Sequence, residues 1–308
     1  MSWAQDVANG VILGATIGLG AIGVTLTYSI LRFANFTHGD LIAWGAYFAL
    51  GLLALGRATG LWGSGLGPVG PFSFGWPFVL VLPLAMAATT ALALGLDRVL
   101  FRALRRRAGE LTLVIASFGA SLALRNLLVF LYGPQPDYFT REIQIARAVL
   151  PGVRVTADQL ALLGLTAGLV LALHLLLTRT TLGRAMRATS ENPALVRVTG
   201  IDPEAVARWT WVIGGALAAV AGVFVGLTVQ IRPLMGADLL LPLFAAAILG
   251  GIGSVYGALL GGLVVGLAEA LAVPLVGAEY RAAVAFVVLL DVLLIRPRGL
   301  FGEREDGA

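Results

Sequence analysis

Long, nearly uncharged apolar segments recur along this 308-residue chain and limit the folds open to it. A helix rises about 1.5 Å per residue, so roughly 20 apolar residues cross the hydrocarbon of a bilayer. Such segments occur near residues 8–30, 38–56, 76–96, 111–132, 158–178 and 209–230, followed by two apolar regions at 239–273 and 279–295. Hydrophobic residues make up 58% of the chain and charged residues 12%, so lipid must solvate it. We predict an all-α, polytopic transmembrane helix bundle.

The region 239–273 decides how often the chain crosses the membrane. It is too long for one span, and the glycine-rich sequence GGIGS (Gly250 to Ser254) interrupts it, which predicts two short crossings. Nine crossings place 14 arginines inside and six outside, with Arg125 in the membrane, whereas eight crossings give 12 and eight. The positive-inside rule favours nine, with the N-terminus outside and the C-terminus inside. Asp6 and the lack of a basic leader favour a retained first helix over a cleaved signal.

Composition excludes several classes of function. There is no Cys, so disulfides and thiolate chemistry are absent, and all 21 basic residues are Arg, which excludes a P-loop lysine. Any ATP must be hydrolysed by another subunit. The net charge of +4 is spread over short loops rather than one patch, which favours membrane orientation over nucleic-acid binding. We expect one transmembrane domain over residues 1–308, with the outer loop at 133–157 an ordered turn rather than a domain.

Few polar residues lie among the apolar segments, and four of them cluster in the sequence FANFTHGDL: Asn35, Thr37, His38 and Asp40. In hydrocarbon such groups must face protein or a water-filled path, so they are candidates for lining a transport route. The alternative is a helix cap, with Asn35 or Thr37 capping the second helix and Asp40 in its first turn. No metal spacing is present, and the other histidine, His174, is interpreted as structural.

A basic segment between two apolar stretches, GRAMRATSENPALVRVTGIDPEA, contains Arg184, Arg187 and Arg197 and must lie in water. We expect a cytoplasmic connector at about residues 179–208. The prediction for its first part is a helix from Thr181 to Ser190.

The rest of the connector contains two further breaks. Asn192 is expected to cap a short helix with Pro193 at its first position. Gly200 is expected to close that helix in a left-handed conformation, and Asp202 to cap the next one. Such a stiff connector can transmit force to two transmembrane helices at once.

Glycines four residues apart indicate close helix packing, in the two sets Gly10, Gly14, Gly18 and Gly253, Gly257, Gly261. Arg125 is interpreted as reaching the lipid headgroups, with a role in the pathway as the alternative. Glu269 and Asp291 lie near predicted membrane faces, where a carboxylate needs little explanation.

Four stretches, in order, carry a family resemblance: ANFTHGDLIAWGAY, GRAMRATSENPALVRVTGI, ILGGIGSVYGALLGGLVVGLAE and LIRPRGLFG. Together they resemble the permease subunits of branched-chain amino acid ABC transporters, within the wider family that includes ribose-type importer permeases. The resemblance spans nearly the whole chain. Thr37 and Arg125 depart from it, where a small apolar residue and a neutral or acidic polar residue are expected.

The resemblance implies an importer permease of the bacterial plasma (inner) membrane that is not itself an enzyme and binds no cofactor. Its implied partners are a second, similar permease, two cytoplasmic ATP-binding subunits that bind the ATP, and an external solute-binding protein. We assign contact with the ATPase to Arg184, Arg187, Glu191 and Asn192, and the shape of that contact to Pro193 and Gly200.

Three alternatives remain at this level. Urea or short amides could replace the branched-chain amino acids as cargo, because related permeases carry similar motifs. A secondary transporter would need coupling-ion ligands near mid-membrane, which the sequence does not supply. A membrane-embedded enzyme would need a catalytic set, and a chain without Cys, Lys or paired carboxylates offers little.

Overall fold

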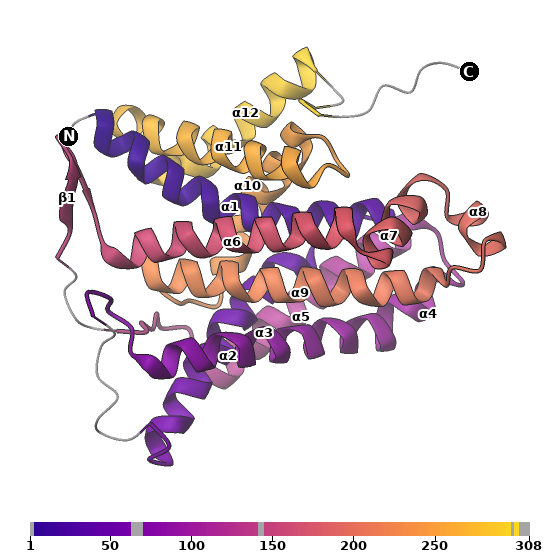
Figure 1. Ribbon diagram of the computed structural model, residues 1–308, viewed down its shortest axis with the longest axis horizontal. Coiled ribbons are helices and arrows are strands. Elements are labelled where there is room, and N and C mark those ends of the chain that lie inside the picture. Colours follow the sequence, from indigo (N-terminus) through magenta and orange to yellow (C-terminus); the bar gives the residue numbers. More distant parts are fainter. Residues whose placement is uncertain (1–2, 63–69, 141–144, 297–298, 302–308) are drawn as a thin grey trace.

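The computed structural model describes residues 3–62, 70–140, 145–296 and 299–301. Its long helices run between the two ends of a bundle (Figure 1): α1 (Trp3–Leu31), α2 (Thr37–Ala58), α3 (Trp76–Leu96), α5 (Glu110–Tyr132), α6 (Ala157–Arg179), α9 (Pro203–Thr228) and α11 (Val255–Val276). The shorter helices are α4 (Arg102–Arg105), α7 (Thr181–Glu191), α8 (Pro193–Val198), α10 (Met235–Gly250) and α12 (Arg281–Ile295). A π-helical turn, η1 (Asp97–Phe101), joins α3 to α4, and a 3₁₀ turn, η2 (Ala278–Tyr280), precedes α12.

The predicted helix bundle is confirmed. Within the described ranges, seven helices are long and apolar enough to cross a membrane. The predicted break in the region 239–273 is also present, because α10 ends at Gly250 and α11 begins at Val255. With 16 residues, α10 is about 24 Å long, which is shorter than the hydrocarbon core of a bilayer. The number of crossings and the orientation stay predictions.

The loop at 133–157, which is predicted to lie outside, contains a small hairpin, with β1 (Arg147–Leu150) paired antiparallel to β2 (Val153–Val155). A second antiparallel bridge joins Asp137 to Ile231, so this loop is tied to the segment after α9. Residues 141–144 of the loop lie outside the described residues.

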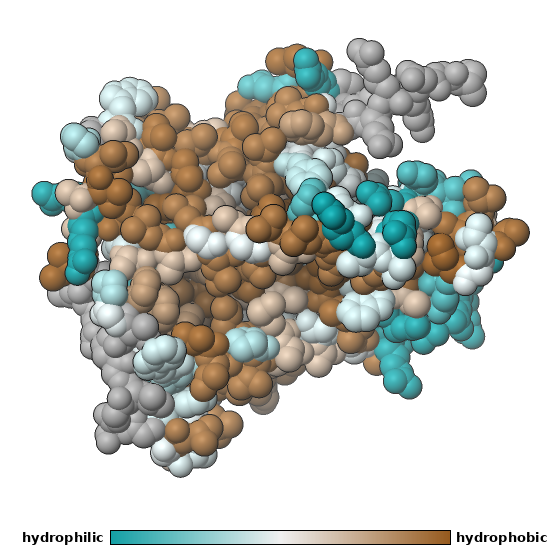
Figure 2. All heavy atoms as spheres, in the orientation of Figure 1, coloured by the Kyte–Doolittle hydropathy of each residue, from teal (hydrophilic) through white to brown (hydrophobic). Residues whose placement is uncertain are grey.

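Helices α1 and α9 form the centre of the bundle, and α3, α5 and α6 form its periphery. Most of α1 and α9 is buried, whereas most residues of the apolar helices α3, α5 and α6 are exposed or only partly buried. Figure 2 shows this hydrophobic face over the middle of the molecule, with hydrophilic residues gathered at the end that carries α4 and α7. An exposed apolar face of this kind is stable in lipid or against another apolar protein surface.

Close backbone contact joins α1 to α11. A Cβ atom added at Gly262 would lie 2.3 Å from the Cα of Gly18, and one added at Gly266 would lie 2.3 Å from the backbone nitrogen of Gly14. Contacts run in opposite directions along the two helices, which are therefore antiparallel. The predicted glycine stripe on α1 is confirmed as a packing face, with Gly262 and Gly266 as its partners.

Of the second predicted stripe, Gly257 and Gly261 lie on a packing face of α11, whereas Gly253 lies in a turn. Gly257 and Gly261 face α10, where added Cβ atoms would lie 2.1 Å from the carbonyl oxygens of Gly250 and Ala246. Gly253 is not part of this stripe, because it lies in the turn before α11 with a φ of +97°. Its amide donates to Thr25 Oγ1 on α1 at 2.8 Å, which fixes the α10–α11 turn near the C-terminal half of α1.

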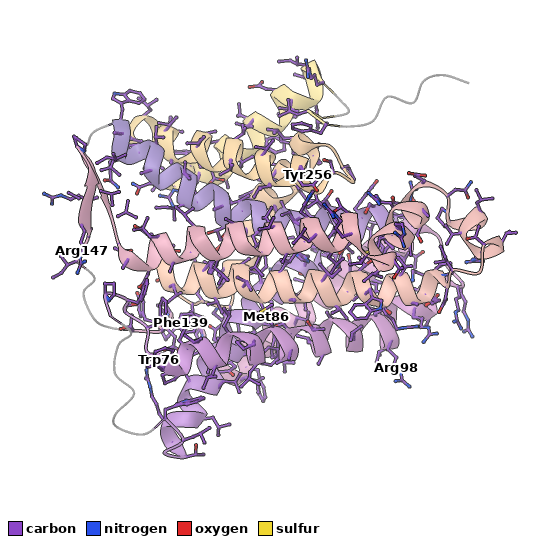
Figure 3. The ribbon with its side chains drawn as sticks, viewed as in Figure 1. Trp76, Met86, Arg98, Phe139, Arg147 and Tyr256 are labelled. Carbon is purple, nitrogen blue, oxygen red and sulfur yellow. The ribbon has the colours of Figure 1, made fainter. Side chains whose placement is uncertain are left out.

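The arginine-rich segments gather at one end of the bundle, as predicted. Arg102 of α4 forms an ion pair of 3.2 Å with Glu204 in the first turn of α9, so the two segments are neighbours. Arg98 lies at this end in Figure 3, whereas Arg147 of the hairpin lies at the other. The chain beyond Ile295 returns to the turn after α10, where the amide of Leu300 donates to the carbonyl of Leu249 at 2.8 Å. Residues 297–298 and 302–308 of the predicted cytoplasmic tail lie outside the described residues.

Candidate functional site

The segment between α6 and α9, residues 180–202, forms a compact double turn that we call the coupling segment. After α6 the chain reverses direction into α7 at Gly183, where an added Cβ would lie 2.2 Å from the carbonyl oxygen of Leu177. Met186 is buried under α7. Arg32, in a left-handed conformation just after α1, donates from its guanidinium to the carbonyl oxygen of Ser190. The coupling segment is therefore attached to α1 as well as to α6 and α9.

The breaks predicted in this segment are confirmed. Asn192 Oδ1 accepts the backbone amides of Ala194 and Leu195 at 3.1 and 3.0 Å, and Pro193 occupies the first turn of α8. Gly200 has a φ of +83°, and Asp202 Oδ1 accepts the amide of Glu204 at 2.9 Å. Side-chain caps of this kind satisfy amides that have no partner within a helix, so α8 is held as a separate short helix.

The surface of the coupling segment is basic with an apolar tip. All four residues assigned to the ATPase contact, Arg184, Arg187, Glu191 and Asn192, are exposed. Leu195 and Val198 on α8 are also exposed, at 62% and 84%, while Val196 between them is buried. Sequence reasoning missed these two apolar residues, because a six-residue helix is too short for its periodicity to show which face is buried. The signal was present as apolar residues within an otherwise solvated basic loop.

The four residues assigned to the transport path lie together, deep inside the bundle. The connection after α1 folds back, so α2 begins between α1, α5 and α10. Asn35, Thr37, His38 and Asp40 are each at most 1% exposed. Asn35 Oδ1 accepts the amide of Thr37 at 3.1 Å, but the N-cap position of α2 is Phe36, which has no side-chain capping bond, so of the predicted cap only the place of Asp40 in the first turn is confirmed.

Gly39 lies within the first turn of α2. The small size of Gly39 serves packing: an added Cβ would lie 2.4 Å from the carbonyl oxygen of Gly236 at the start of α10. His38 occupies the space beside Gly23 of α1, where a Cβ would lie 2.4 Å from its Cε1. Within the described ranges, His38 Nε2 and Asn35 Nδ2 have no hydrogen-bond partner. The start of α2 therefore contains two buried polar atoms without a hydrogen-bond partner.

Asp40 and Arg125 form a buried ion pair between α2 and α5. Arg125 Nε lies 3.4 Å from Asp40 Oδ1, and Ser121 donates its hydroxyl to the other carboxylate oxygen. The side chain of Arg125 is 19% exposed and that of Asp40 is fully buried. The interpretation of Arg125 as a residue that reaches the headgroups is thus wrong, because a buried carboxylate one helix away offers a stronger partner.

His174 also has a partner that the sequence did not indicate. Its Nδ1 is hydrogen-bonded to the hydroxyl of Tyr256, which joins α6 to α11. Tyr256 is labelled in Figure 3.

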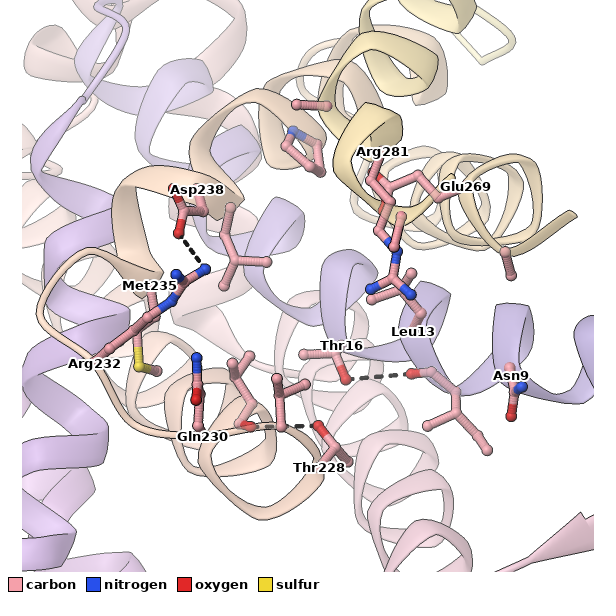
Figure 4. A pocket seen from close by; sticks show the side chains of 18 of the residues that line it. Asn9, Leu13, Thr16, Thr228, Gln230, Arg232, Met235, Asp238, Glu269 and Arg281 are labelled. Carbon is pink, nitrogen blue, oxygen red and sulfur yellow. Dashed lines mark hydrogen bonds and ion pairs between the residues drawn. The ribbon is translucent and has the colours of Figure 1, made fainter. Parts of the chain in front are cut away.

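A pocket of about 550 Å³ opens at the end of the bundle away from the coupling segment. It lies between α1, α9, α10, α11 and α12, and its polar lining residues include Gln159, Glu279 and those labelled in Figure 4: Asn9, Thr16, Thr228, Gln230, Arg232, Asp238, Glu269 and Arg281. None of the four path residues lines it. The first turns of α10 separate the two sites, since Met235 and Leu239 face the pocket while Gly236 and Leu240 contact Gly39. No metal-binding group of three or more His, Asp or Glu occurs in the described ranges.

Comparison with known proteins places this architecture in a family. Residues 7–293 match a family model described as the permease component of the branched-chain amino acid transport system. The chain belongs to this family. It is a permease subunit of a transporter and not an enzyme.

Individual relatives match the permease over nearly its full length. It is 33% identical to BraD, a high-affinity branched-chain amino acid transport system permease protein of Pseudomonas aeruginosa, with 98% of this chain and 97% of BraD covered. LivH of Escherichia coli, with the same description, is also 33% identical, with 98% and 96% covered. A probable branched-chain amino acid transport permease LivH of Methanocaldococcus jannaschii is 28% identical, with 95% and 90% covered.

Proposed function

We propose that this chain is a transmembrane subunit of an ATP-driven importer that carries branched-chain amino acids across the inner membrane. The observation that carries the proposal is the family match over residues 7–293, supported by relatives of the same named function over nearly the whole chain. A permease of this class works with cytoplasmic ATP-binding subunits, an external solute-binding protein and a second permease subunit. The exposed apolar faces of α3, α5 and α6 offer surface for lipid and for that second permease.

The coupling segment is the proposed contact with the ATPase subunits. Its apolar tip, Leu195 and Val198, is suited to insertion into a groove, and Arg184 and Arg187 beside it are suited to acidic residues at the rim. Asn192, Pro193 and Gly200 fix the shape of the tip, as the capping bonds and the positive φ indicate. The direct connection to α6 and α9, and the bond from Arg32 to Ser190, support transmission of force to three helices.

The proposed gate is the start of α10. This helix stands between the pocket and the buried start of α2, and part of its contact with α2 is made by backbone at Gly39 and Gly236, with the side chain of Leu240 beside it. Contacts between small residues reduce the number of side chains that must move when one helix shifts against another. When the ATPase subunits close, movement of the bundle would expose His38 and Asn35, each of which has a polar atom without a hydrogen-bond partner, to the route.

The test uses the complete importer in proteoliposomes with its own binding protein and labelled leucine. Replacement of Leu195 and Val198 together by Asp, or of Arg184 and Arg187 together by Glu, is expected to reduce leucine uptake at least tenfold and to abolish ATPase stimulation by the binding protein. The matched control reverses Arg106 and Arg107, which are exposed near α4 at the same end and outside the coupling segment.

Two results would refute the proposal. Unchanged uptake in both coupling-segment variants would remove the assignment of the ATPase contact. Uptake of urea or a short amide, with no uptake of leucine, would replace the proposed substrate.

A further inference from the structure

One carboxylate in the pocket is buried without a complete set of partners. Glu269 lies on α11, about two turns before the helix ends at Val276, and is only 4% exposed. Its Oε1 atom has no hydrogen-bond partner in the part of the chain that the structure describes. Arg281 attracts this carboxylate electrostatically without reaching ion-pair distance, so what Oε1 lacks is a hydrogen-bond donor, and a buried carboxylate oxygen without a donor is costly. The adjacent residue, Ala270, packs close to Gly10 of α1, which holds Glu269 in place.

The same pocket contains two arginines, one of which forms an ion pair and one of which does not. Arg232 forms an ion pair of 2.8 Å with Asp238 at the start of α10. Arg281, in the first turn of α12, is exposed, and among the described residues it has no ion pair within 4.0 Å. Figure 4 shows its side chain extending from α12 into the pocket toward α1. Glu269 and Arg281 thus offer one negative and one positive group on adjacent helices.

One part of the pocket wall is apolar and is formed by Ile12, Leu13, Met235, Leu239 and Pro242, while Asn9, Thr16, Gln159, Thr228, Gln230 and a second carboxylate, Glu279, also line the pocket. A volume of about 550 Å³ is within the range of small-molecule sites and leaves room for one amino acid and water. An anion, a cation and an apolar wall in one pocket match the three parts of an aliphatic amino acid. The ammonium group would bind Glu269, the carboxylate would bind Arg281, and the side chain would lie against α1 and α10.

We propose that this pocket is a recognition site through which the permease receives a zwitterionic aliphatic amino acid, with Glu269 as the partner of the ammonium group. This inference deepens the proposed function and rests on it. The pocket opens at the ends of α6 and α9 opposite the coupling segment, so in a cytoplasmic-coupling orientation it faces the binding protein. Selection by this site would follow selection by the binding protein.

The first experiment measures leucine uptake and ATPase activity of the complete importer in proteoliposomes. Glu269→Gln keeps the shape of the side chain and removes its charge, and is expected to lower leucine uptake at least tenfold. Glu269→Asp is expected to keep more activity than Gln, because the charge remains. The control Asp291→Asn removes one negative charge from an exposed position of α12 outside the pocket, and is expected to stay within twofold of the unmodified importer.

A second experiment detects occupancy directly and uses the absence of native Cys in this chain. Ala282→Cys places a thiol on the pocket lining, and Ala283→Cys places one on the same helix outside it. Leucine is expected to slow labelling of the first thiol by a charged thiosulfonate and not of the second. With Glu269→Gln added, the leucine concentration that protects the thiol at position 282 should be at least tenfold higher. The compound 4-methylpentanoate, which lacks the ammonium group, should protect poorly both with and without Glu269→Gln.

The outcomes separate this inference from the proposed function. If the unmodified importer does not take up leucine, the proposed function fails. If it does, and Glu269→Gln transports and protects as the unmodified chain does, the recognition site is refuted. Protection by leucine and by 4-methylpentanoate at equal concentrations would also refute the role of Glu269. If Glu269→Gln abolishes ATPase stimulation by the binding protein along with uptake and leaves protection unchanged, Glu269 acts in assembly or gating and the inference fails.

Discussion

The glycine contact between α1 and α11 gives a prediction that can be worked out from distances. Gly262→Ala places a Cβ 2.3 Å from the Cα of Gly18, whereas an ordinary contact begins at 3.4 Å. The obstacle is backbone and cannot rotate away. The two helices must therefore separate by about 1.1 Å, the difference between those two distances. Because α1 lies at the centre of the bundle, this separation also loosens its other contacts.

The expected cost follows from overpacking. Added methyl groups in a well-packed interior typically cost about 1 to 3 kcal/mol. Replacing Gly by Ala in a helix also contributes roughly 1 kcal/mol of stabilisation through the backbone, which partly hides the clash. Gly164→Ala on α6 is the matched control, because no heavy atom lies within 4 Å of its added Cβ. The difference between the two variants isolates the packing term of about 1 to 3 kcal/mol.

The assay is thermal unfolding of the purified permease in detergent, followed by loss of its monodisperse peak in size-exclusion chromatography. Gly262→Ala should unfold several degrees below Gly164→Ala. Adding Gly266→Ala to Gly262→Ala should cost less than the sum of the two single changes, because one separation of the helices relieves both clashes. Equal midpoints for Gly262→Ala and Gly164→Ala would show that α1 and α11 are not in backbone contact, and would refute the reasoning.

Two further predictions concern the buried pair and the coupling segment. Arg125→Met leaves Asp40 buried without its cation and should destabilise the protein by about 3 to 5 kcal/mol, and the double variant with Asp40→Asn should recover part of this loss. The same chromatographic assay measures both variants. Equal midpoints for Arg125→Met and the unmodified protein would contradict the pairing. Asn192→Ala removes the cap of α8 and should destabilise that helix by about 0.5 to 2 kcal/mol. The loss should be seen as faster amide hydrogen exchange at Ala194 and Leu195, while exchange in α9 stays unchanged. Slow exchange at both amides in the variant would show that the cap does not hold α8.

Local features were predictable where the physical cause is local. The approximate positions of the membrane helices followed from apolar length, and the break before α11 followed from GGIGS. Asn192, Pro193, Gly200 and Asp202 took the expected positions in the coupling segment, because caps and positive φ depend on neighbouring residues alone. The grouping of the arginine-rich segments at one end also followed, since charge cannot enter hydrocarbon.

Features that depend on distant residues were not predictable. Arg125 was interpreted as reaching lipid because the position of Asp40, 85 residues earlier, was unknown. The glycines that face α1 are Gly262 and Gly266, and no spacing rule distinguishes them from Gly257 and Gly261, which face α10. From the sequence, Glu269 was a carboxylate near a helix end. Only the packing of α1 and α12 around it shows that it is buried.

By itself, then, the sequence determined that this chain is a multi-pass helical membrane protein, which segments form its membrane helices, and where the breaks in its basic connector lie. These properties depend on transfer into lipid and on short-range capping, and both can be judged from a few consecutive residues. The tertiary structure alone decided which polar groups are paired and which are left open. A partner for a buried charge is chosen by helix packing, and packing brings together residues that the sequence keeps far apart.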